Sequence, residues 1–247
     1  MNKVLTTLLL MLVPTLALAA DLDRMNPDMN DRASLQRGAA LFTNNCMGCH
    51  SAEYHRYMHV AEDLGIPDDL YEENLIFTGV RIGQLMENAM PGDDAEEWFG
   101  VAPPDLTLAA RVHSPDWIYS FLRGFYVDET RPLGVNNVVF DNVGMPHAMV
   151  NQGGLCAEEP NIGGRGSVDP MSGEVVGGTV CEDYAIEGSM SPDEFDRAMY
   201  DLTNFMVYLG EPALMDRKRI GTYVLIFIGV FFIFAYLLNR EYWKDIH

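Results

Sequence analysis

Lysine is almost absent from this chain of 247 residues, which has only Lys3, Lys218 and Lys244. Residues 21–215 contain 33 acidic residues and 10 arginines, so this stretch carries a net charge of −23. A protein that binds nucleic acid needs Lys and Arg to neutralise phosphates, and this stretch has the opposite sign. The composition therefore excludes nucleic acid as a partner and favours a basic partner.

Cysteine is also scarce. Four cysteines are too few for a small domain held together by disulfides, so each of them needs its own explanation. Disorder is excluded because 48% of the residues are hydrophobic and 11% are aromatic. The length suits one domain with appendages.

Charge is missing from an apolar stretch near the start of the chain. Residues 4–18 follow Lys3 and end at the small-residue motif Ala17-Leu18-Ala19. This is the pattern of a secretory signal peptide, which we expect in residues 1–19. The alternative is an N-terminal membrane anchor, which Pro14 and the cleavage motif disfavour.

A second stretch without charge, residues 220–238, lies near the other end. At about 1.5 Å per residue, its 19 residues nearly span a hydrocarbon core of about 30 Å. We expect a transmembrane anchor here, and a buried helix of a soluble protein is the alternative. The basic residues on its N-terminal side weakly oppose an exported domain, but the signal peptide outweighs them.

These two stretches divide the chain into three parts. We expect a signal peptide in residues 1–19, an exported domain in residues 20–215, and an anchor with a short tail in residues 216–247. The exported domain then lies in the periplasm of a bacterium, tethered to the inner membrane by one C-terminal helix.

Three segments of the exported domain have helical patterns. Residues 31–42 place Leu35, Gly38, Ala39 and Phe42 on one face. Two further helices begin at capping serines that are each followed by proline, at Ser114 and at Ser191. The apolar residues of the last helix form a single stripe: Phe195, Met199, Leu202, Met206 and Leu209. Because no alternating strand run stands out, we predict an all-α domain.

The sequence Cys46-Met47-Gly48-Cys49-His50 is a C-x-x-C-H motif, which is typical of covalent haem c attachment. Two thiols at this spacing can reach the two vinyl groups of one porphyrin, and the histidine can bind the iron from one face. A thioredoxin-like pair would need a βαβ setting, and a zinc site would need a second Cys/His pair at ligand spacing. A disulfide between Cys46 and Cys49 would leave His50 unexplained.

The haem iron of an electron carrier needs a sixth ligand. Two methionines precede proline, Met90 and Met145. Met90 has the spacing of a small soluble cytochrome, but an acidic run follows it that would be costly to desolvate. Met145 lies in a less charged loop. Composition favours Met145 without deciding between them.

The chain resembles the cytochrome c1 family, whose members are haem subunits of ubiquinol–cytochrome c oxidoreductase. The resemblance covers most of the exported domain and the anchor. It rests on five segments in order: Cys46 to Ser51 with the aromatic stretch through Tyr57, then Ala102-Pro103-Pro104-Asp105-Leu106 with Arg111, then the helix from Trp117 to Phe125, then Val143-Gly144-Met145-Pro146, and last Gly210-Glu211-Pro212 before the anchor.

The resemblance implies roles for individual residues. Met145 becomes the sixth ligand of the iron, opposite His50. Arg111 becomes a partner of a haem propionate, where a surface charge is the ordinary interpretation. Pro103 and Pro104 pass His50, so that a backbone carbonyl accepts the imidazole N–H and sets its tautomer.

The chain departs from familiar members of the family in residues 152–189. This Gly-rich segment carries Cys156 and Cys181, which in an exported chain are most simply a structural disulfide. A labile redox pair is the alternative.

The function implied is transfer of one electron at a time, with no bond-making chemistry of the chain's own. By resemblance, the donor is a Rieske iron–sulfur protein beside a cytochrome b subunit, and the acceptor is a basic soluble cytochrome c. The alternative is a membrane-tethered mono-haem cytochrome c of another respiratory complex. Two further hypotheses are a haem enzyme or gas sensor with an open iron position, and a tethered thiol–disulfide oxidoreductase.

Overall fold

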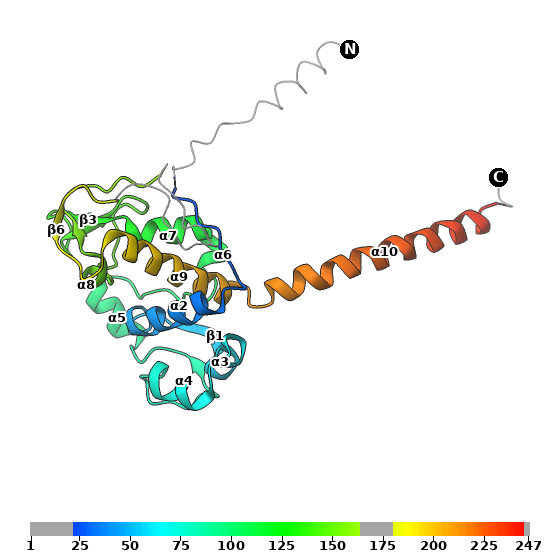
Figure 1. Cartoon of the computed structure of the whole chain (residues 1–247), viewed down its shortest axis with the longest axis horizontal. Helices are drawn as coiled ribbons and strands as arrows, with labels where there is room; N and C mark the ends of the chain where they lie inside the picture. The colour runs from blue at the N-terminus through cyan, green and yellow to red at the C-terminus, as the bar shows by residue number, and fades with distance from the viewer. Residues whose placement is uncertain (1–21, 164–179, 245–247) are drawn as a thin grey trace, which may run out of the picture.

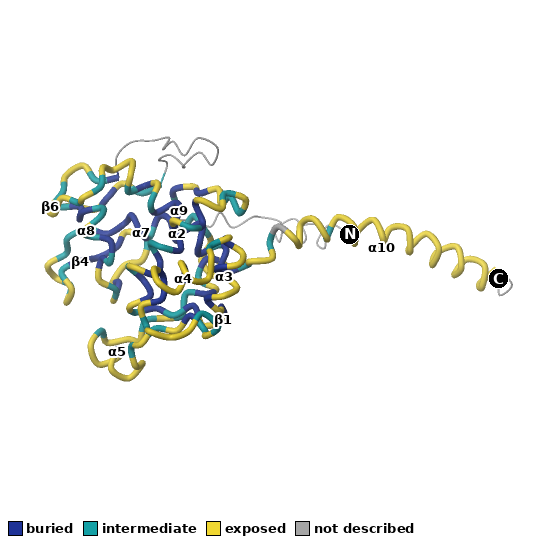
Figure 2. Tube along the Cα trace, turned by 60° about the horizontal axis from the view of Figure 1, so that its bottom comes forward, coloured by how far each residue is buried: buried dark blue, intermediate teal, exposed yellow. Residues whose placement is uncertain are grey.

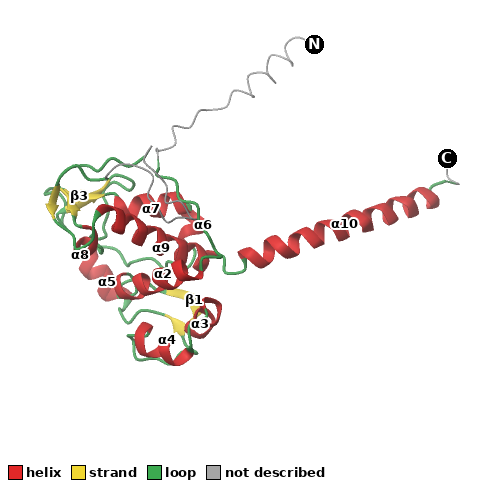
Figure 3. Ribbon diagram, in the orientation of Figure 1, coloured by secondary structure: helices red, strands yellow, loops and turns green. Residues whose placement is uncertain are grey.

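The computed structural model describes residues 22–163 and 180–244, and the expected signal peptide lies outside them. The described part is mainly helical, and short strands occupy two places (Figure 3). The helical fold class is confirmed. The strands were not predicted, since none has more than five residues.

Two long helices lie side by side at the centre of the domain, α2 (Arg32–Asn45) and α9 (Pro192–Gly210) (Figure 1). They approach closely because Gly38 of α2 faces the backbone of Asp201. The rings of Phe42 and Phe205 pack across the contact, with centroids 5.5 Å apart. Each helix begins at a side-chain cap, Asp31 for α2 and Ser191 for α9, and the predicted capping box of α9 is present.

Two helices continue this layer, α6 (Ala109–His113) and α7 (Pro115–Arg123). The cap of α7 is the predicted Ser114, whose hydroxyl accepts the N–H of Trp117. The helix ends two residues earlier than predicted, because Gly124 caps it and Phe125 begins a strand.

The remaining elements form two groups in chain order. After the haem motif come β1 (Ala52–Arg56), α3 (Tyr57–Leu64), α4 (Asp68–Leu75), β2 (Leu85–Met86) and α5 (Gly92–Phe99). The second group is β3 (Phe125–Val127), β4 (Val135–Asn137), α8 (Val150–Gly153), β5 (Leu155–Cys156) and β6 (Tyr184–Ile186). Strands β3 and β6 lie at the end of the domain opposite α3 and α4 (Figure 1). The sheet order at this end is β4-β3-β5-β6, with β3 and β5 parallel.

The core has a large and a small part. Buried residues are concentrated in α2, α7 and α9 (Figure 2). The large part fills the space between α2, α7, α9 and the first group of elements, and it includes Cys46 and Met47 of the motif. The small part lies under the four-stranded sheet and consists of Phe125, Val135, Val143 and Leu155.

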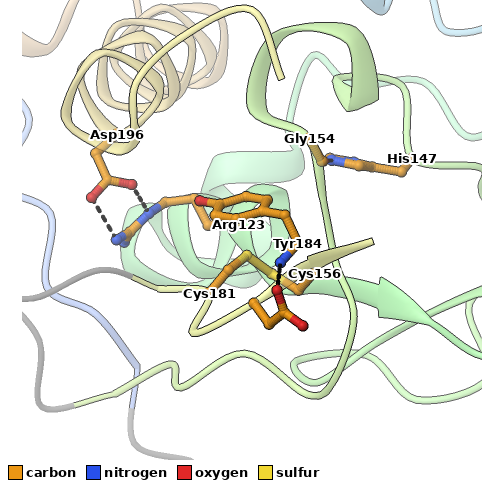
Figure 4. Close-up of a disulfide and its surroundings, with 8 residues drawn as sticks. Arg123, His147, Gly154, Cys156, Cys181, Tyr184 and Asp196 are labelled. Carbon is orange, nitrogen blue, oxygen red and sulfur yellow. Dashed lines mark hydrogen bonds and ion pairs between the residues drawn. A yellow bond between two sulfur atoms is a disulfide. The ribbon is translucent and has the colours of Figure 1, made fainter. Parts of the chain in front are cut away.

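A buried ionic cluster joins three distant segments. The guanidinium of Arg123 bonds both oxygens of Asp196 and lies 2.8 Å from a carboxylate oxygen of Asp23 (Figure 4 shows the pair with Asp196). It also lies 4.3 Å from the ring centroid of Tyr119. Because all three charged groups are buried, the cluster fixes the N-terminal segment and α9 against α7.

The last helix, α10 (Leu214–Tyr242), projects away from the domain (Figure 1). Residues 216–242 of it are long and apolar enough to cross a membrane, and none of their most apolar window is buried. A buried helix of a soluble protein does not fit this exposure. A transmembrane helix does, because lipid would cover the apolar side chains.

Candidate haem site

The C-x-x-C-H motif forms a tight turn at the end of α2. Cys46 closes the helix through its N–H to the carbonyl of Phe42, 2.9 Å away. The N–H groups of Cys49 and His50 both point back to the carbonyl of Cys46, at 3.0 and 2.9 Å. Neither cysteine of this turn forms a disulfide. Burial raises the pKa of the Cys46 thiol to about 12, so this group is a neutral thiol.

The ring of His50 is fixed by the segment that contains Pro103 and Pro104. Nδ1 of His50 lies 2.7 Å from the carbonyl oxygen of Pro104. A carbonyl can only accept, so Nδ1 carries the proton and Nε2 is the nitrogen available to a metal. His50 is buried, and this burial lowers its pKa and favours the neutral ring that binds iron.

Asn88 holds the motif from another side, and no sequence signal indicated it. Its side-chain amide donates to the carbonyl of Cys49 at 2.7 Å, and its N–H donates to the hydroxyl of Ser51 at 3.0 Å. The same side chain accepts the N–H of Met90 at 2.9 Å. Asn88 therefore connects the backbone of Met90, just before α5, to the carbonyl of Cys49.

Met145 lies in the loop that follows β4. It is half-buried and packs against the small core part under the sheet. Its neighbour Gly144 lies next to Val101, since a Cβ on Gly144 would stand 3.6 Å from a methyl group of Val101. Segment 101–104 thus bonds His50 through the carbonyl of Pro104 and lies beside Gly144 of the Met145 loop at Val101.

The residue after Met145-Pro146 is a buried histidine. His147 stacks on Phe125 with centroids 4.6 Å apart, and its Nε2 lies 3.0 Å from the carbonyl oxygen of Gly154. Burial lowers the pKa of His147 to about 4, so the ring is neutral at physiological pH.

Arg111 lies in α6, where its aliphatic part packs against the end of α9. A Cβ on Gly210 would stand 3.0 Å from Cγ of Arg111. The residue is exposed, so the guanidinium is free to contact a propionate. Its role towards haem stays a prediction.

The structure joins Cys156 and Cys181 in a disulfide, with 5.3 Å between their Cα atoms (Figure 4). Cys156 is buried in β5, so the bridge attaches the chain before β6 to the sheet. Residues 164–179, between the two cysteines, lie outside the described part.

The donors present fit a covalent haem c whose iron would be held by two side chains of this chain. Two free thiols, one imidazole with its Nε2 available, and a thioether in an apolar loop are the chemistry that such a haem requires. Among the described residues, no group of three or more His, Cys, Asp or Glu side chains is placed to hold a metal ion directly.

A helical domain with one such motif at the end of its first helix, followed by an apolar C-terminal helix, defines a membrane-anchored c-type cytochrome. The family model described as "Cytochrome C1 family" matches residues 25–246. The chain belongs to the cytochrome c1 family, and proteins of this family carry one covalent haem c.

Individual relatives agree with this assignment. The chain is 47% identical to cytochrome c1 of Allochromatium vinosum over 253 residues, which cover all of both chains. It is 41% identical to the ammonia monooxygenase gamma subunit of Nitrosomonas europaea, over 92% of this chain and 89% of that one. Cytochrome c1 of Rhodobacter capsulatus is more distant, at 22% identity over 86% and 83% of the two chains.

Proposed function

We propose that this chain is the haem c subunit of a ubiquinol–cytochrome c oxidoreductase. It receives one electron at a time from a Rieske iron–sulfur protein, beside a cytochrome b subunit, and passes it to a soluble c-type cytochrome. The observation that carries the proposal is the position of segment 101–104: its Pro104 carbonyl bonds His50, and its Val101 lies beside Gly144 of the Met145 loop. A haem held between two such anchored ligands is a fixed electron relay.

The chain's own residues would act by holding and tuning the cofactor. Cys46 and Cys49 would attach it, and His50 and Met145 would bind its iron, while Arg111 would pair with a propionate. When bound, haem c supplies a one-electron couple between two oxidation states of iron. The thioether of Met145 would favour the reduced state and raise the potential. The carbonyl of Pro104, which accepts the Nδ1–H of His50, would make the imidazole more basic. The chain itself makes and breaks no bonds during turnover.

The charge of the domain supports a basic acceptor. Residues 21–215 contain no lysine, and the acidic side chains of α4 and α5 are exposed. Long-range attraction speeds the encounter of opposite charges and weakens as salt screens it. We therefore expect the acceptor to be a basic soluble cytochrome. The signal-peptide pattern and α10 support a haem domain in the periplasm, with α10 in the inner membrane and the signal peptide removed.

The test uses the complex purified from native membranes in mild detergent. We expect this chain to carry the haem stain after denaturing electrophoresis and to copurify with a cytochrome b. In membranes that lack the Rieske subunit, ubiquinol should still reduce cytochrome b while haem c stays oxidised. Equally fast reduction of haem c without the Rieske subunit would contradict the proposed donor.

The similarity to a subunit named for ammonia monooxygenase favours a second candidate. In that case the chain would be the mono-haem subunit of a different membrane oxidoreductase. Copurification separates the two: a partner complex without cytochrome b supports the second candidate and contradicts the first.

A further inference from the structure

His147, the residue directly after Met145-Pro146, is anchored to the elements of the four-stranded sheet. The imidazole is 9% exposed, which is unusual for a histidine in a loop. Its face stacks on Phe125 of β3, with an angle of 18° between the two rings. Its edge reaches the carbonyl of Gly154, just before β5 (Figure 4). Both partners of His147 therefore lie in the four-stranded sheet or next to it: Phe125 begins β3, and Gly154 directly precedes β5.

The acceptor of this hydrogen bond cannot move easily. Gly154 has a φ of +77°, and a Cβ there would meet the backbone of Ile186 and Gly188. The adjacent residues form β5, which pairs with both β3 and β6. The carbonyl of Gly154 is therefore fixed by the sheet.

The residues between His147 and Gly154 also bond to one another. The N–H of Val150 donates to the carbonyl of His147 at 3.3 Å, and the N–H of Gly154 donates to the carbonyl of Val150 at 2.9 Å. Together with the bond from His147 to the Gly154 carbonyl, these bonds close residues 147–154 into a compact loop that includes α8. His147 connects this loop to the segment that contains Met145.

The position of His147 is passed on to Met145 through one proline. Pro146 fixes its own φ and restricts the residue before it, so few rotations remain between the two side chains. On the other side of Met145, Val143 is buried in the small core part. Asn142, with a φ of +62°, is held through its N–H by the side-chain oxygen of Asn136 at 2.9 Å. Met145 is therefore held by the buried residue Val143 on one side and by His147 on the other.

We infer that His147 is a positioning residue for the axial methionine: its Nε2–H bond to the Gly154 carbonyl and its stack on Phe125 hold the thioether of Met145 at the iron. This inference rests on the proposed function, because it requires Met145 to be the sixth ligand. A thioether is a soft ligand and binds oxidised iron more weakly than reduced iron. The oxidised protein therefore depends most on this support.

The test compares three substitutions in the purified, haem-loaded complex. His147→Phe keeps a ring for the stack and removes the donor. His147→Ala removes both, and His147→Gln restores an N–H donor at similar reach. The readouts are the methionine-to-iron charge-transfer band of the oxidised protein, the reduction potential, and the rate of carbon monoxide binding to the reduced protein.

We expect His147→Phe and His147→Ala to weaken the band, to lower the potential, and to bind carbon monoxide about tenfold faster or more, since loss of such a support typically costs about 10–100-fold in metal affinity. His147→Gln should recover most of the wild-type behaviour. An unchanged band and potential in His147→Phe would overturn the inference.

His55 provides a matched control for a general loss of packing. It is equally buried, its ring centroid lies 5.9 Å from that of Tyr208, and its Nε2 lies 2.8 Å from the carbonyl oxygen of Leu209, but it belongs to β1. We expect His55→Phe to leave the methionine band in place. An equal loss of the band in both Phe variants would overturn a specific role for His147.

The wild-type protein separates this inference from the proposed function. If the oxidised wild type has no methionine band, the ligand assignment of Met145 fails whatever His147 does. If the wild type has the band and His147→Phe keeps it, only the role of His147 fails.

Discussion

The Nδ1 nitrogen of His50 lies 2.7 Å from the carbonyl oxygen of Pro104. The carboxylate of Asp105, the next residue, keeps this carbonyl in place. Its two oxygens accept the N–H groups of Glu53 and Thr107, at 2.8 and 2.9 Å. The carboxylate therefore attaches the segment to β1, just after His50, and also holds the next turn of its own segment. The basicity of the His50 imidazole depends on that attachment.

Replacing Asp105 by alanine should raise the reduction potential of the haem. Without the two N–H bonds the Pro104 carbonyl moves, the hydrogen bond to His50 weakens, and a less basic imidazole stabilises oxidised iron less well. Potentiometric titration measures the effect. Asp105→Asn removes the charge and keeps one acceptor oxygen, so it should shift the potential less. Equal shifts in the two variants would mean that charge alone is responsible.

Removing the guanidinium of Arg123 should destabilise the domain strongly. Arg123→Met leaves Asp23 and Asp196 buried without their cation, and loss of one partner from a buried cluster costs about 3–5 kcal/mol. Urea unfolding followed by circular dichroism measures the free energy of unfolding.

The ion pair between Arg37 and Asp201 serves as the control for Arg123. The Arg37 side chain is 58% exposed, so Arg37→Met should cost about 1 kcal/mol or less. If the two variants lost the same free energy, burial would not be the reason for the effect at Arg123.

The close contact of α2 with α9 predicts a sharp contrast between two glycines. A methyl group at Gly38 would overlap the carbonyl of Asp201 and the side chain of Phe205. Gly38→Ala should therefore destabilise the domain by about 1–3 kcal/mol through overpacking. At Gly48, inside the haem motif, a Cβ meets no described atom within 4 Å, and Gly48→Ala should be tolerated. Thermal unfolding of the two variants and the wild type measures this contrast. A Gly38→Ala protein as stable as the wild type would contradict the close contact of α2 with α9.

Alkaline pH should destabilise the fold through buried tyrosines. Burial raises the pKa of Tyr200 to about 12, whereas an unfolded tyrosine has a pKa of about 10. The folded state then holds a proton that the unfolded state releases. The contribution to stability is complete below about pH 10 and is lost as the pH rises towards 12.

Tyr200→Phe tests this dependence. At neutral pH it should cost about 1 kcal/mol, because the hydroxyl of Tyr200 donates to the carbonyl of Asn26 at 3.0 Å. Between pH 10 and 12 its unfolding temperature should fall less steeply than that of the wild type. Tyr54, which is 68% exposed, supplies the control, and Tyr54→Phe should follow the wild-type curve. Parallel curves for Tyr200→Phe and the wild type would contradict the assignment.

Helices with local start signals could be predicted from the sequence. The caps at Ser114 and Ser191 determine where α7 and α9 begin, and the apolar face of α2 follows from its periodicity. The short strands could not be predicted. β5 has two residues, and its pairing with Tyr126 of β3 depends on contacts between distant segments. Such pairing leaves no period-two pattern to read.

The same distinction applies to the site. Cys46, Cys49 and His50 are adjacent in sequence, so their spacing alone indicates a haem. The roles of Asn88 and His147 come from contacts with a backbone carbonyl, for which any donor of the right reach would serve. Neither residue therefore carries a signal of its own. Met145 was predicted as the sixth ligand from the family resemblance, because composition did not decide between Met145 and Met90.

The pairing of His50 with Met145 at one iron is tested most directly by the near-red absorption of the oxidised, haem-loaded protein. We predict that the methionine-to-iron charge-transfer band is present in the wild type and in Met90→Leu and absent in Met145→Leu. A band that survives in Met145→Leu and disappears in Met90→Leu would contradict the assignment.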